Sequence, residues 1–253
     1  MKSKLPASHL FRQFLLFALT LVFLLTLIRA AYALWQFSRV QMTDALMPMF
    51  VQGLRFDLAL VGILCIVPLI VGAILAMMTR TRSLAKFLIT SFMVIGLLLV
   101  MLTEMITPWF LETRGVRPDL QLLSSIEEPA SLLRSLVYEQ AVPLGLAMFL
   151  CMLVLMAFWG RLEMRRFLRH RLSVPGAMML AIVGGAICVL AITSSTDPVH
   201  FTLSPADAHI STDVTINELS MNTAYKLLYS AIWRIPEAPV PVEQQITIVQ
   251  EPL

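Results

Sequence analysis

The stretch LALVGILCIVPLIVGAILAMM, Leu58–Met78, contains no charged side chain and decides the class of fold. A helix crosses a hydrocarbon core of ~30 Å with about 20 residues, because each residue adds ~1.5 Å along the axis. This stretch is therefore predicted to be a transmembrane helix. Four further stretches have similar length and composition, and we predict the same structure for them: Phe14–Leu34, Phe87–Met105, Ala141–Trp159 and Pro175–Ile192.

The composition of the whole chain agrees with this prediction. Hydrophobic residues make up 58% of the sequence, charged residues only 14%, and the mean hydropathy is +0.81. Soluble domains contain about 25% charged residues, so the composition excludes that class. We expect an all-α membrane protein whose residues 1–193 form a five-helix transmembrane domain. The first span is longer than the apolar region of a signal peptide, and we expect it to be retained as an anchor.

Basic residues predict the orientation, because short loops rich in Lys and Arg stay in the cytoplasm. Three basic clusters fall on one side of the predicted spans, whereas acids balance or outnumber bases on the other. We therefore expect a multi-pass protein of the bacterial cell (inner) membrane, with a cytoplasmic N-terminus and a periplasmic, extracytoplasmic tail. Such short juxtamembrane clusters argue against a nucleic-acid partner. The clusters comprise Lys2, Lys4 and Arg12, then Arg80, Arg82 and Lys86, then Arg161, Arg165, Arg166, Arg169 and Arg171.

The cysteines and histidines predict no metal or catalytic site. Cys65, Cys151 and Cys188 all lie within predicted spans, where thiols behave as small apolar groups. Neither a disulfide framework nor a zinc site follows from them. The four histidines lack the i, i+4 spacing of a metal site on a helix.

Charged residues near membrane depth need an explanation, since each costs roughly 2.5–3.5 kcal/mol at a helix centre. One interpretation places Arg29, Arg55, Asp57 and Glu104 in a polar patch that binds an anionic lipid headgroup. The other is structural: Arg29 extends to the interface, Glu104 pairs with Arg29 or Arg55, and Asp57 caps the second span. Both interpretations stay open. Because Arg55 and Asp57 are two residues apart, they point to different faces of a helix.

Two segments on the outer side are expected to be helical. In residues 106–140 the spacing of apolar residues predicts either two short amphipathic pieces in the membrane interface or a helical hairpin packed on the bundle. Residues 194–235 predict an extracytoplasmic juxtamembrane helical segment that lies on the surface, with N-cap candidates at 211–213. Asn217, Asn222 and Tyr225 either position a headgroup, dock a further domain or, as we expect, sit on a solvated face.

The closing residues have a different character. Three prolines in the range 236–241 remove backbone donors and favour an extended linker. The β-branched run Ile246–Val249 follows, and such a run is typical of a buried strand of a parallel sheet. A lone strand is not stable, so we interpret 236–253 as a Pro-rich linker and the first strand of an α/β domain absent from this chain. Ligands bind beyond the carboxyl ends of such strands, where Glu251 would lie.

Four segments, taken in order with the five-span topology, resemble the N-terminal membrane region of the lipoteichoic acid synthase family. These proteins are membrane phosphoglycerol or phosphoethanolamine transferases of the alkaline phosphatase and sulfatase superfamily. The resemblance covers nearly the whole chain, and the order of the segments carries more of it than any single motif. The segments are GLRFDLAL (Gly53–Leu60), TEMITPWFLETRGVRPD (Thr103–Asp119), INELSMNTAYKLLYS (Ile216–Ser230) and ITIVQEPL (Ile246–Leu253).

The resemblance implies transfer of a headgroup from a membrane phospholipid to cell-envelope glycopolymers by a sulfatase-like catalytic domain, in cis or in trans. It implies a divalent cation, Mn²⁺ or Mg²⁺, and only Glu251 maps onto a metal ligand. Pro252 follows it, where the family usually has Ser or Thr. No catalytic nucleophile of the family maps onto this chain, so we expect the chain alone to be inactive, as a membrane anchor and lipid-access region.

An alternative function belongs to a different class. The chain is then a stand-alone, non-enzymatic membrane protein that binds lipid or helps a complex to assemble. The two hypotheses differ in whether a sulfatase-like domain accompanies this chain in the cell.

Overall fold

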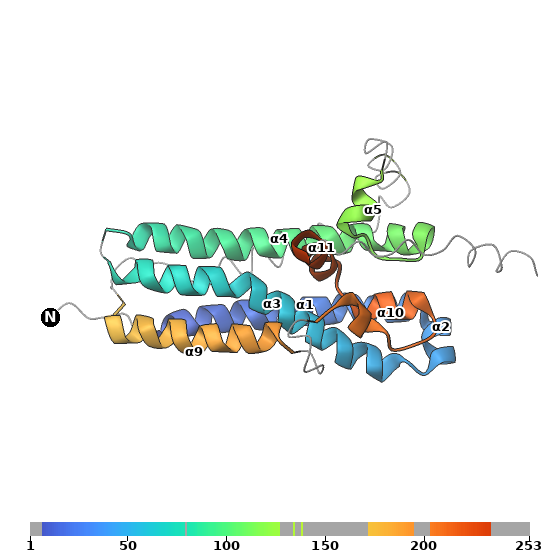
Figure 1. Cartoon of the computed structure of the whole chain (residues 1–253), viewed down its shortest axis with the longest axis horizontal. Coiled ribbons are helices and arrows are strands. Elements are labelled where there is room, and N and C mark those ends of the chain that lie inside the picture. The colour runs from blue at the N-terminus through green and yellow to red at the C-terminus, as the bar shows by residue number, and fades with distance from the viewer. Residues whose placement is uncertain are drawn as a thin grey trace, which may run out of the picture.

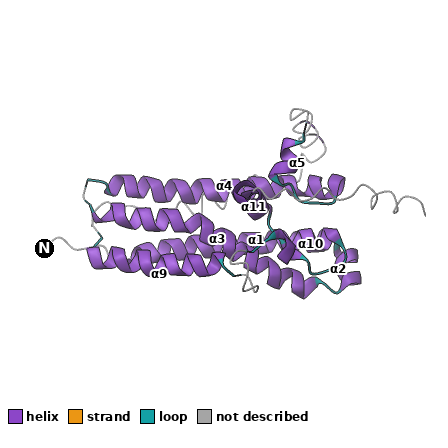
Figure 2. Cartoon of the chain, viewed as in Figure 1, coloured by secondary structure: helices purple, strands orange, loops and turns teal. Residues whose placement is uncertain are grey.

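A computed structural model describes residues 7–78, 80–126, 134, 138, 172–194 and 203–233. Within these ranges every regular element is a helix and there is no strand, so the prediction of an all-α fold is confirmed for this part of the chain (Figures 1 and 2). The elements are α1 (Ala7–Trp35), α2 (Phe37–Thr43), α3 (Leu46–Met77), α4 (Arg82–Arg114), α5 (Leu120–Ser124), α9 (Val174–Ile192), the 3₁₀ helix η1 (Pro205–Ala208), α10 (Val214–Ser220) and α11 (Thr223–Trp233).

Four of these helices, α1, α3, α4 and α9, are long and apolar enough to span a membrane. Each covers one of the predicted spans, α3 to within one residue, so the molecule has the character of a membrane protein. The fourth predicted span, Ala141–Trp159, lies outside the described residues, and five spans stay a prediction. The basic cluster at 161–171 and the closing segment 236–253, with Ile246–Val249 and Glu251, also lie outside them.

Helices continue beyond the predicted spans. The residues that separate the first two predicted spans, 35–57, hold α2 and the start of α3. Likewise α4 continues past Met105 to Arg114, and the five residues of α5 form a separate short helix. The predicted spans end or begin near Asp57 and Glu104, but α3 and α4 continue past these residues, whose charges are paired inside the bundle.

α3 is the central helix of the bundle, because it packs against α1, α4 and α9. Two glycines let α3 and α9 approach closely. A methyl group at Gly62 would lie 2.7 Å from the backbone oxygen of Cys188, and one at Gly184 would lie 2.7 Å from Cδ1 of Leu69. Small residues at such crossings bring helix backbones into van der Waals contact, which is a main source of helix association in a bilayer.

The ends of α9 can be matched to positions on α3. Near the start of α9, the N–H of Leu172 donates to the carbonyl oxygen of Ala76 at 3.2 Å, and at its other end Ile192 lies beside Gly62. α3 has 32 residues, or ~48 Å at ~1.5 Å per residue, and so is longer than the ~30 Å hydrocarbon core. Because Ile192 lies beside Gly62, residues 46–57 extend past the end of α9, as α4 also does (Figure 1).

We call the part beyond α9 the distal layer. It consists of α1 from Arg29 onward, α2, residues 46–57 of α3, residues 104–114 of α4, η1, α10 and α11. Figure 1 shows α11 nearly end-on, so that it crosses α3 and α4 while those helices run along the molecule. The distal layer is where the polar side chains of the bundle meet.

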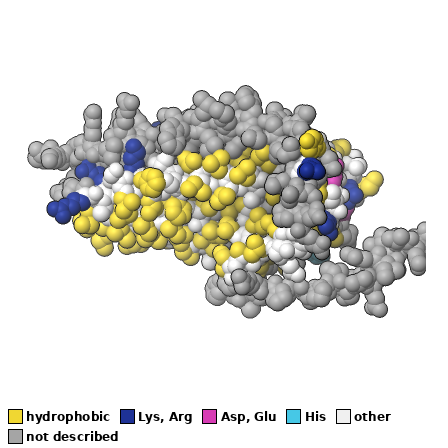
Figure 3. Space-filling view, turned by 90° about the horizontal axis from the view of Figure 1, so that it is seen from above, with side chains coloured by type: hydrophobic (Ala, Val, Ile, Leu, Met, Phe, Trp, Pro, Cys, Tyr) yellow, Lys and Arg dark blue, Asp and Glu magenta, His cyan; other side chains and the backbone are white. Residues whose placement is uncertain are grey.

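The surface fits a membrane protein. Hydrophobic side chains cover much of the described middle of the molecule on the face that Figure 3 shows, and Lys and Arg gather toward its ends. Large apolar side chains such as Phe23, Phe87 and Ile182 are 62%, 70% and 66% exposed. In water such exposure would be costly, whereas lipid tails cover it without loss.

Candidate functional site

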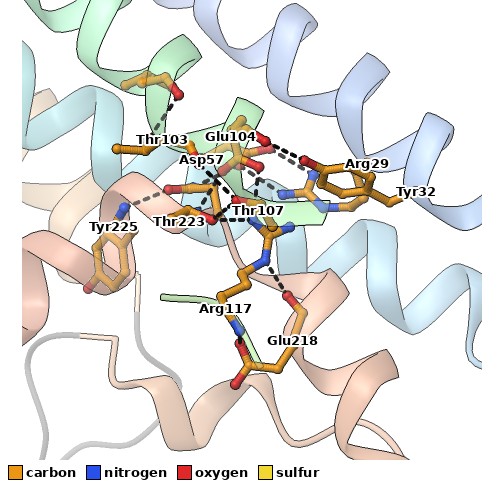
Figure 4. A network of polar contacts seen from close by, with 12 residues as sticks. Arg29, Tyr32, Asp57, Thr103, Glu104, Thr107, Arg117, Glu218, Thr223 and Tyr225 are labelled. Carbon is orange, nitrogen blue, oxygen red and sulfur yellow. Dashed lines mark hydrogen bonds and ion pairs between the residues drawn. The ribbon is translucent and has the colours of Figure 1, made fainter. Parts of the chain in front are cut away.

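A buried ion pair joins α1 to α3 in the distal layer. The two terminal nitrogens of Arg29 donate to the two carboxylate oxygens of Asp57 at 2.8 Å each, and the side chains are only 3% and 0% exposed (Figure 4). Two parallel bonds of this kind fix direction as well as distance. The pair needs Gly53, because a methyl group there would lie 2.2 Å from Cζ of Arg29. Asn222 adds a third bond by donating from Nδ2 to Asp57 at 3.0 Å.

A second buried pair joins α4 to the segment that follows it. Nη1 of Arg117 donates to Oε2 of Glu104 at 2.8 Å, and both side chains are about 2–3% exposed. The guanidinium also lies over the ring of Tyr32, with Cζ 5.4 Å from the centroid, a cation–π distance. Arg117 therefore contacts α1 and α4 at once.

Arg117 also binds α10 and α11. Its Nε donates to the backbone oxygen of Glu218 at 2.6 Å, its backbone N–H donates to the Glu218 carboxylate at 3.0 Å, and Nη1 reaches Oγ1 of Thr223 at 2.7 Å. The other carboxylate oxygen of Glu218 accepts from Nζ of Lys226 at 2.8 Å. Through these bonds Arg117 links both α10 and α11 to the bundle.

The carboxylate of Glu104 binds the first turn of α11. Oε1 of Glu104 accepts from the backbone N–H of Thr223 at 2.6 Å, where the unpaired N–H groups of a helix start favour negative charge. Asn222 caps the same turn, because its Oδ1 accepts from the N–H of Tyr225 at 2.8 Å. The hydroxyl oxygens of Thr107 and Thr223 lie 2.5 Å apart and close the contact between α4 and α11.

A proline explains how Tyr32 enters the network. Pro108 lies inside α4 and has no N–H, so it leaves the carbonyl oxygen of Glu104, four residues earlier, without its helical partner. The hydroxyl of Tyr32 donates to that oxygen at 2.7 Å. The interruption of α4 thus creates an acceptor that α1 satisfies.

Two groups outside the membrane-length helices have shifted pKa values. Burial by itself lowers the pKa of Arg117, but Glu104 and the other anionic neighbours outweigh it, so the pKa lies above its ordinary value and the guanidinium stays charged. Burial raises the pKa of Tyr225, whose hydroxyl donates to the backbone oxygen of Leu203 at 2.7 Å. Both groups keep one protonation state near neutral pH.

The distal network, as we call these residues, is electrically balanced. Three cations face three carboxylates, and removing one partner of a buried pair typically costs about 3–5 kcal/mol because a buried charge is left uncompensated. These buried pairs hold the helices at fixed positions relative to one another. No group of three or more His, Cys, Asp or Glu side chains within the described residues is placed to hold a metal ion. The charged members are Arg29, Arg117, Lys226, Asp57, Glu104 and Glu218.

The structure brings together three of the four residues predicted to form a headgroup patch. Arg29, Asp57 and Glu104 belong to the distal network. Arg55 does not: it donates to the backbone oxygen of Ser194 through Nε at 3.0 Å and through Nη2, and to Gln52 through Nη1 at 2.7 Å. Headgroup binding by these residues stays a prediction.

Several details of the structural alternative need correction. Asp57 lies well inside α3, so it does not cap that helix. Glu104 pairs with Arg117, not with Arg29 or Arg55. Both expectations assumed that the second span starts near Asp57 and that the partners come from neighbouring spans. α3 instead begins at Leu46, and Arg117 folds back from beyond the end of α4.

The expectation that the tail residues face solvent was also wrong. Asn217, Asn222 and Tyr225 are 7%, 1% and 3% exposed. Asp213 does cap α10, as its position suggested, by accepting from the N–H of Thr215 at 2.8 Å. The tail is a packed part of the distal layer because its polar groups meet the charges of α3 and α4.

Sequence reasoning missed five members of the network, although the sequence held a signal for two of them, Tyr32 and Arg117. Pro108 inside an apolar helix predicts a free carbonyl at Glu104 that needs a donor from another helix. Arg117 lies close after the end of that helix, within reach of Glu104. Nothing in the spacing pointed to the others. The missed residues are Tyr32, Arg117, Glu218, Thr223 and Lys226.

No known protein-family model matches this chain, and no solved structure matches it either.

Proposed function

We propose that this chain is the membrane anchor of an envelope phosphoglycerol or phosphoethanolamine transferase. Its distal layer would hold α10 and α11, which precede the point where a catalytic domain would be joined, in a fixed position. A sulfatase-like catalytic domain, joined in cis or bound in trans, would then act at the membrane surface on a phospholipid headgroup with the help of Mn²⁺ or Mg²⁺. Five spans, a cytoplasmic N-terminus and an extracytoplasmic distal layer in the bacterial inner membrane belong to the same proposal.

One observation carries the proposal. Three of the segments that resemble the lipoteichoic acid synthase family lie far apart in the sequence, yet they meet in the distal network. Gly53–Leu60 contributes Gly53 and Asp57, Thr103–Asp119 contributes Glu104 and Arg117, and Ile216–Ser230 contributes the groups that both carboxylates bind. The three segments that carry the resemblance therefore form one site in the folded chain.

The geometry also suits an anchor. α11 lies across α3 and α4, and its first turn is bound to Asp57 through Asn222 and to Glu104 through Thr223. A segment held by buried charges at its start cannot rotate freely about the bundle. Whatever is attached beyond Trp233 would therefore keep a defined height above the membrane, which a headgroup transferase needs in order to reach its lipid.

The burial of the network bears on the predicted lipid patch. Arg29, Asp57 and Glu104 are 3%, 0% and 3% exposed, and each already has an opposite charge. This favours the structural interpretation of these three side chains. Lipid access, if it involves the distal layer, would depend on its surface residues.

Purification from native membranes tests the proposal. We expect a sulfatase-like polypeptide, fused to this chain or bound to it, and release of diacylglycerol from fluorescent phosphatidylglycerol or phosphatidylethanolamine that stops when the divalent cation is chelated. Asn222→Ala should lower this activity at an unchanged membrane level, whereas the exposed Ile232→Ala should not. If no such polypeptide accompanies the chain, the stand-alone alternative replaces the proposal.

A further inference from the structure

Two buried thiols lie in the interface between α3 and α9. Cys65 on α3 and Cys188 on α9 are 5% and 6% exposed, and both are free cysteines. They are close enough for Cys188 to act electrostatically on Cys65. Neither thiol belongs to the distal network, and the proposed function uses neither of them.

Contacts on both sides of the thiols show that they lie opposite each other. Gly62 of α3 lies beside Ile192 of α9. About two turns further along α3, Leu69 lies beside Gly184, which is about two turns earlier in α9. The two helices are therefore antiparallel. Each thiol lies between these two contacts, three or four residues from its neighbours on the buried face of its own helix.

The helix backbones approach closely at this height. A methyl group at Gly62 would lie 2.7 Å from the backbone oxygen of Cys188, so α3 is in van der Waals contact with the residue that carries one of the thiols. Helix axes are ordinarily about 8–10 Å apart, and small residues reduce that distance. A disulfide needs its two Cα atoms to be roughly 4.4–6.8 Å apart. The glycines thus provide the close approach that a disulfide between α3 and α9 requires.

A disulfide also suits the apolar surroundings. One S–S bond replaces two S–H groups, so the pair loses its donor hydrogens and changes little in volume. We propose that Cys65 and Cys188 form a redox pair, and that an organic hydroperoxide dissolved in the membrane oxidises them to a disulfide that joins α3 to α9. This inference does not depend on the proposed function.

The oxidation balances with the hydroperoxide as the only other reactant. The sulfur of one thiol attacks the peroxide, the O–O bond breaks, and an alcohol leaves while a sulfenic acid forms. The second thiol attacks that sulfur, the S–O bond breaks, and water leaves as the S–S bond forms. The two sulfurs together lose two electrons, and the two peroxide oxygens gain them.

Peptide mapping of the full chain in membrane vesicles tests the pair. In a Cys151→Ala background, tert-butyl hydroperoxide should link the Cys65 peptide to the Cys188 peptide. N-ethylmaleimide is added before denaturation, so that unfolded chains cannot pair. The matched control, Cys188→Ala with Ile187→Cys, moves one thiol to a neighbouring position that is 50% exposed and should give no link.

Three results of this mapping overturn the proposal. They are the absence of a link in the Cys151→Ala chain, a link of equal yield in the control, and oxidation of each cysteine on its own to a sulfinic acid.

Thermal unfolding tests what the bond does to the fold. The linked chain should unfold several degrees above the reduced chain, because α3 and α9 can no longer separate, and dithiothreitol should reverse the shift. Cys65→Ala, treated in the same way, should show no shift. An equal shift in Cys65→Ala, or none in the linked chain, overturns the proposal that the bond joins the two packed helices.

Discussion

Pro108 leaves the carbonyl oxygen of Glu104 without a donor within α4, and the hydroxyl of Tyr32 supplies that donor. Tyr32→Phe keeps the ring beneath Arg117 but removes the donor to the Glu104 carbonyl, and a buried acceptor without a partner costs about 1–3 kcal/mol. We expect a lower unfolding temperature in detergent, measured by intrinsic fluorescence.

A second substitution makes this prediction specific. Ala at 108 restores an N–H that can donate to the Glu104 carbonyl within α4, so Pro108→Ala should reduce the loss caused by Tyr32→Phe. Additive effects of the two substitutions would show that the hydroxyl acts through something other than the freed carbonyl.

The ion pair between Arg29 and Asp57 requires that residue 53 has no side chain. Gly53→Ala should displace the Arg29 guanidinium from Asp57 and destabilise the protein by several kcal/mol, because a methyl group would overlap Cζ. Gly96→Ala in α4 is the control: its new methyl group would meet Leu64 at 3.5 Å, an ordinary contact, and Ala favours a helix by about 0.5–1 kcal/mol. Thermal unfolding of the two variants should move in opposite directions. Equal destabilisation would mean that the ion pair is not what Gly53 protects.

At the scale of elements, α11 depends on its first turn. Asn222→Ala removes both the cap to Tyr225 and the donor to Asp57, at a cost of about 1–3 kcal/mol. Hydrogen exchange by mass spectrometry should show faster exchange across α11 and little change in α9. Ile232→Ala, 61% exposed at the far end of α11, should leave exchange near Thr223 unaltered. Uniform acceleration in both helices would argue that Asn222 supports the bundle as a whole.

The sequence predicted those elements that are governed by hydropathy. Four of the five expected spans coincide with α1, α3, α4 and α9, since about 20 apolar residues leave few alternatives to a membrane helix. It did not predict that α3 starts at Leu46 or that α4 runs to Arg114. Residues such as Asp57 and Glu104 were treated as the edges of spans, but they lie inside helices because distant charges neutralise them.

The candidate site was predictable only in part for a related reason. The cost of charge near a membrane singled out Arg29, Asp57 and Glu104, because that cost depends on residue type and depth alone. Their partners depend on how the chain folds back: Arg117 follows α4, and Glu218 and Asn222 come from α10–α11. No local pattern encodes such contacts, which is why the tail was expected to face solvent.

For the whole molecule, the proposed orientation can be tested with single cysteines. Met42 is 86% exposed on α2 in the distal layer, and Ser83 is exposed at the start of α4, at the opposite end of the bundle. A membrane-impermeant maleimide should label Met42→Cys in spheroplasts and should label Ser83→Cys only after the membrane is permeabilised. The reverse pattern would place the distal layer in the cytoplasm and remove the basis for an envelope transferase.

Activity of the isolated chain is the second test at this scale. Residues 1–253 alone, with phosphatidylglycerol and Mn²⁺, should release no diacylglycerol, since the described residues offer no metal-binding cluster and no nucleophile of the family maps onto the sequence. Mass spectrometry of the lipid products checks this. Measurable turnover would require catalytic groups that neither the motifs nor the network supplies.

The short length of α9 makes the molecule sensitive to the lipids around it. α9 has 19 residues, whereas α3 and α4 run well past its end in the distal direction. In a bilayer with longer acyl chains, the mismatch would be met by sinking Leu58 and Leu54 below the headgroups. Tails would then surround apolar side chains of α3 that a thinner bilayer leaves among the headgroups. Bilayer thickness would thus set how far the distal layer stands out from the hydrocarbon.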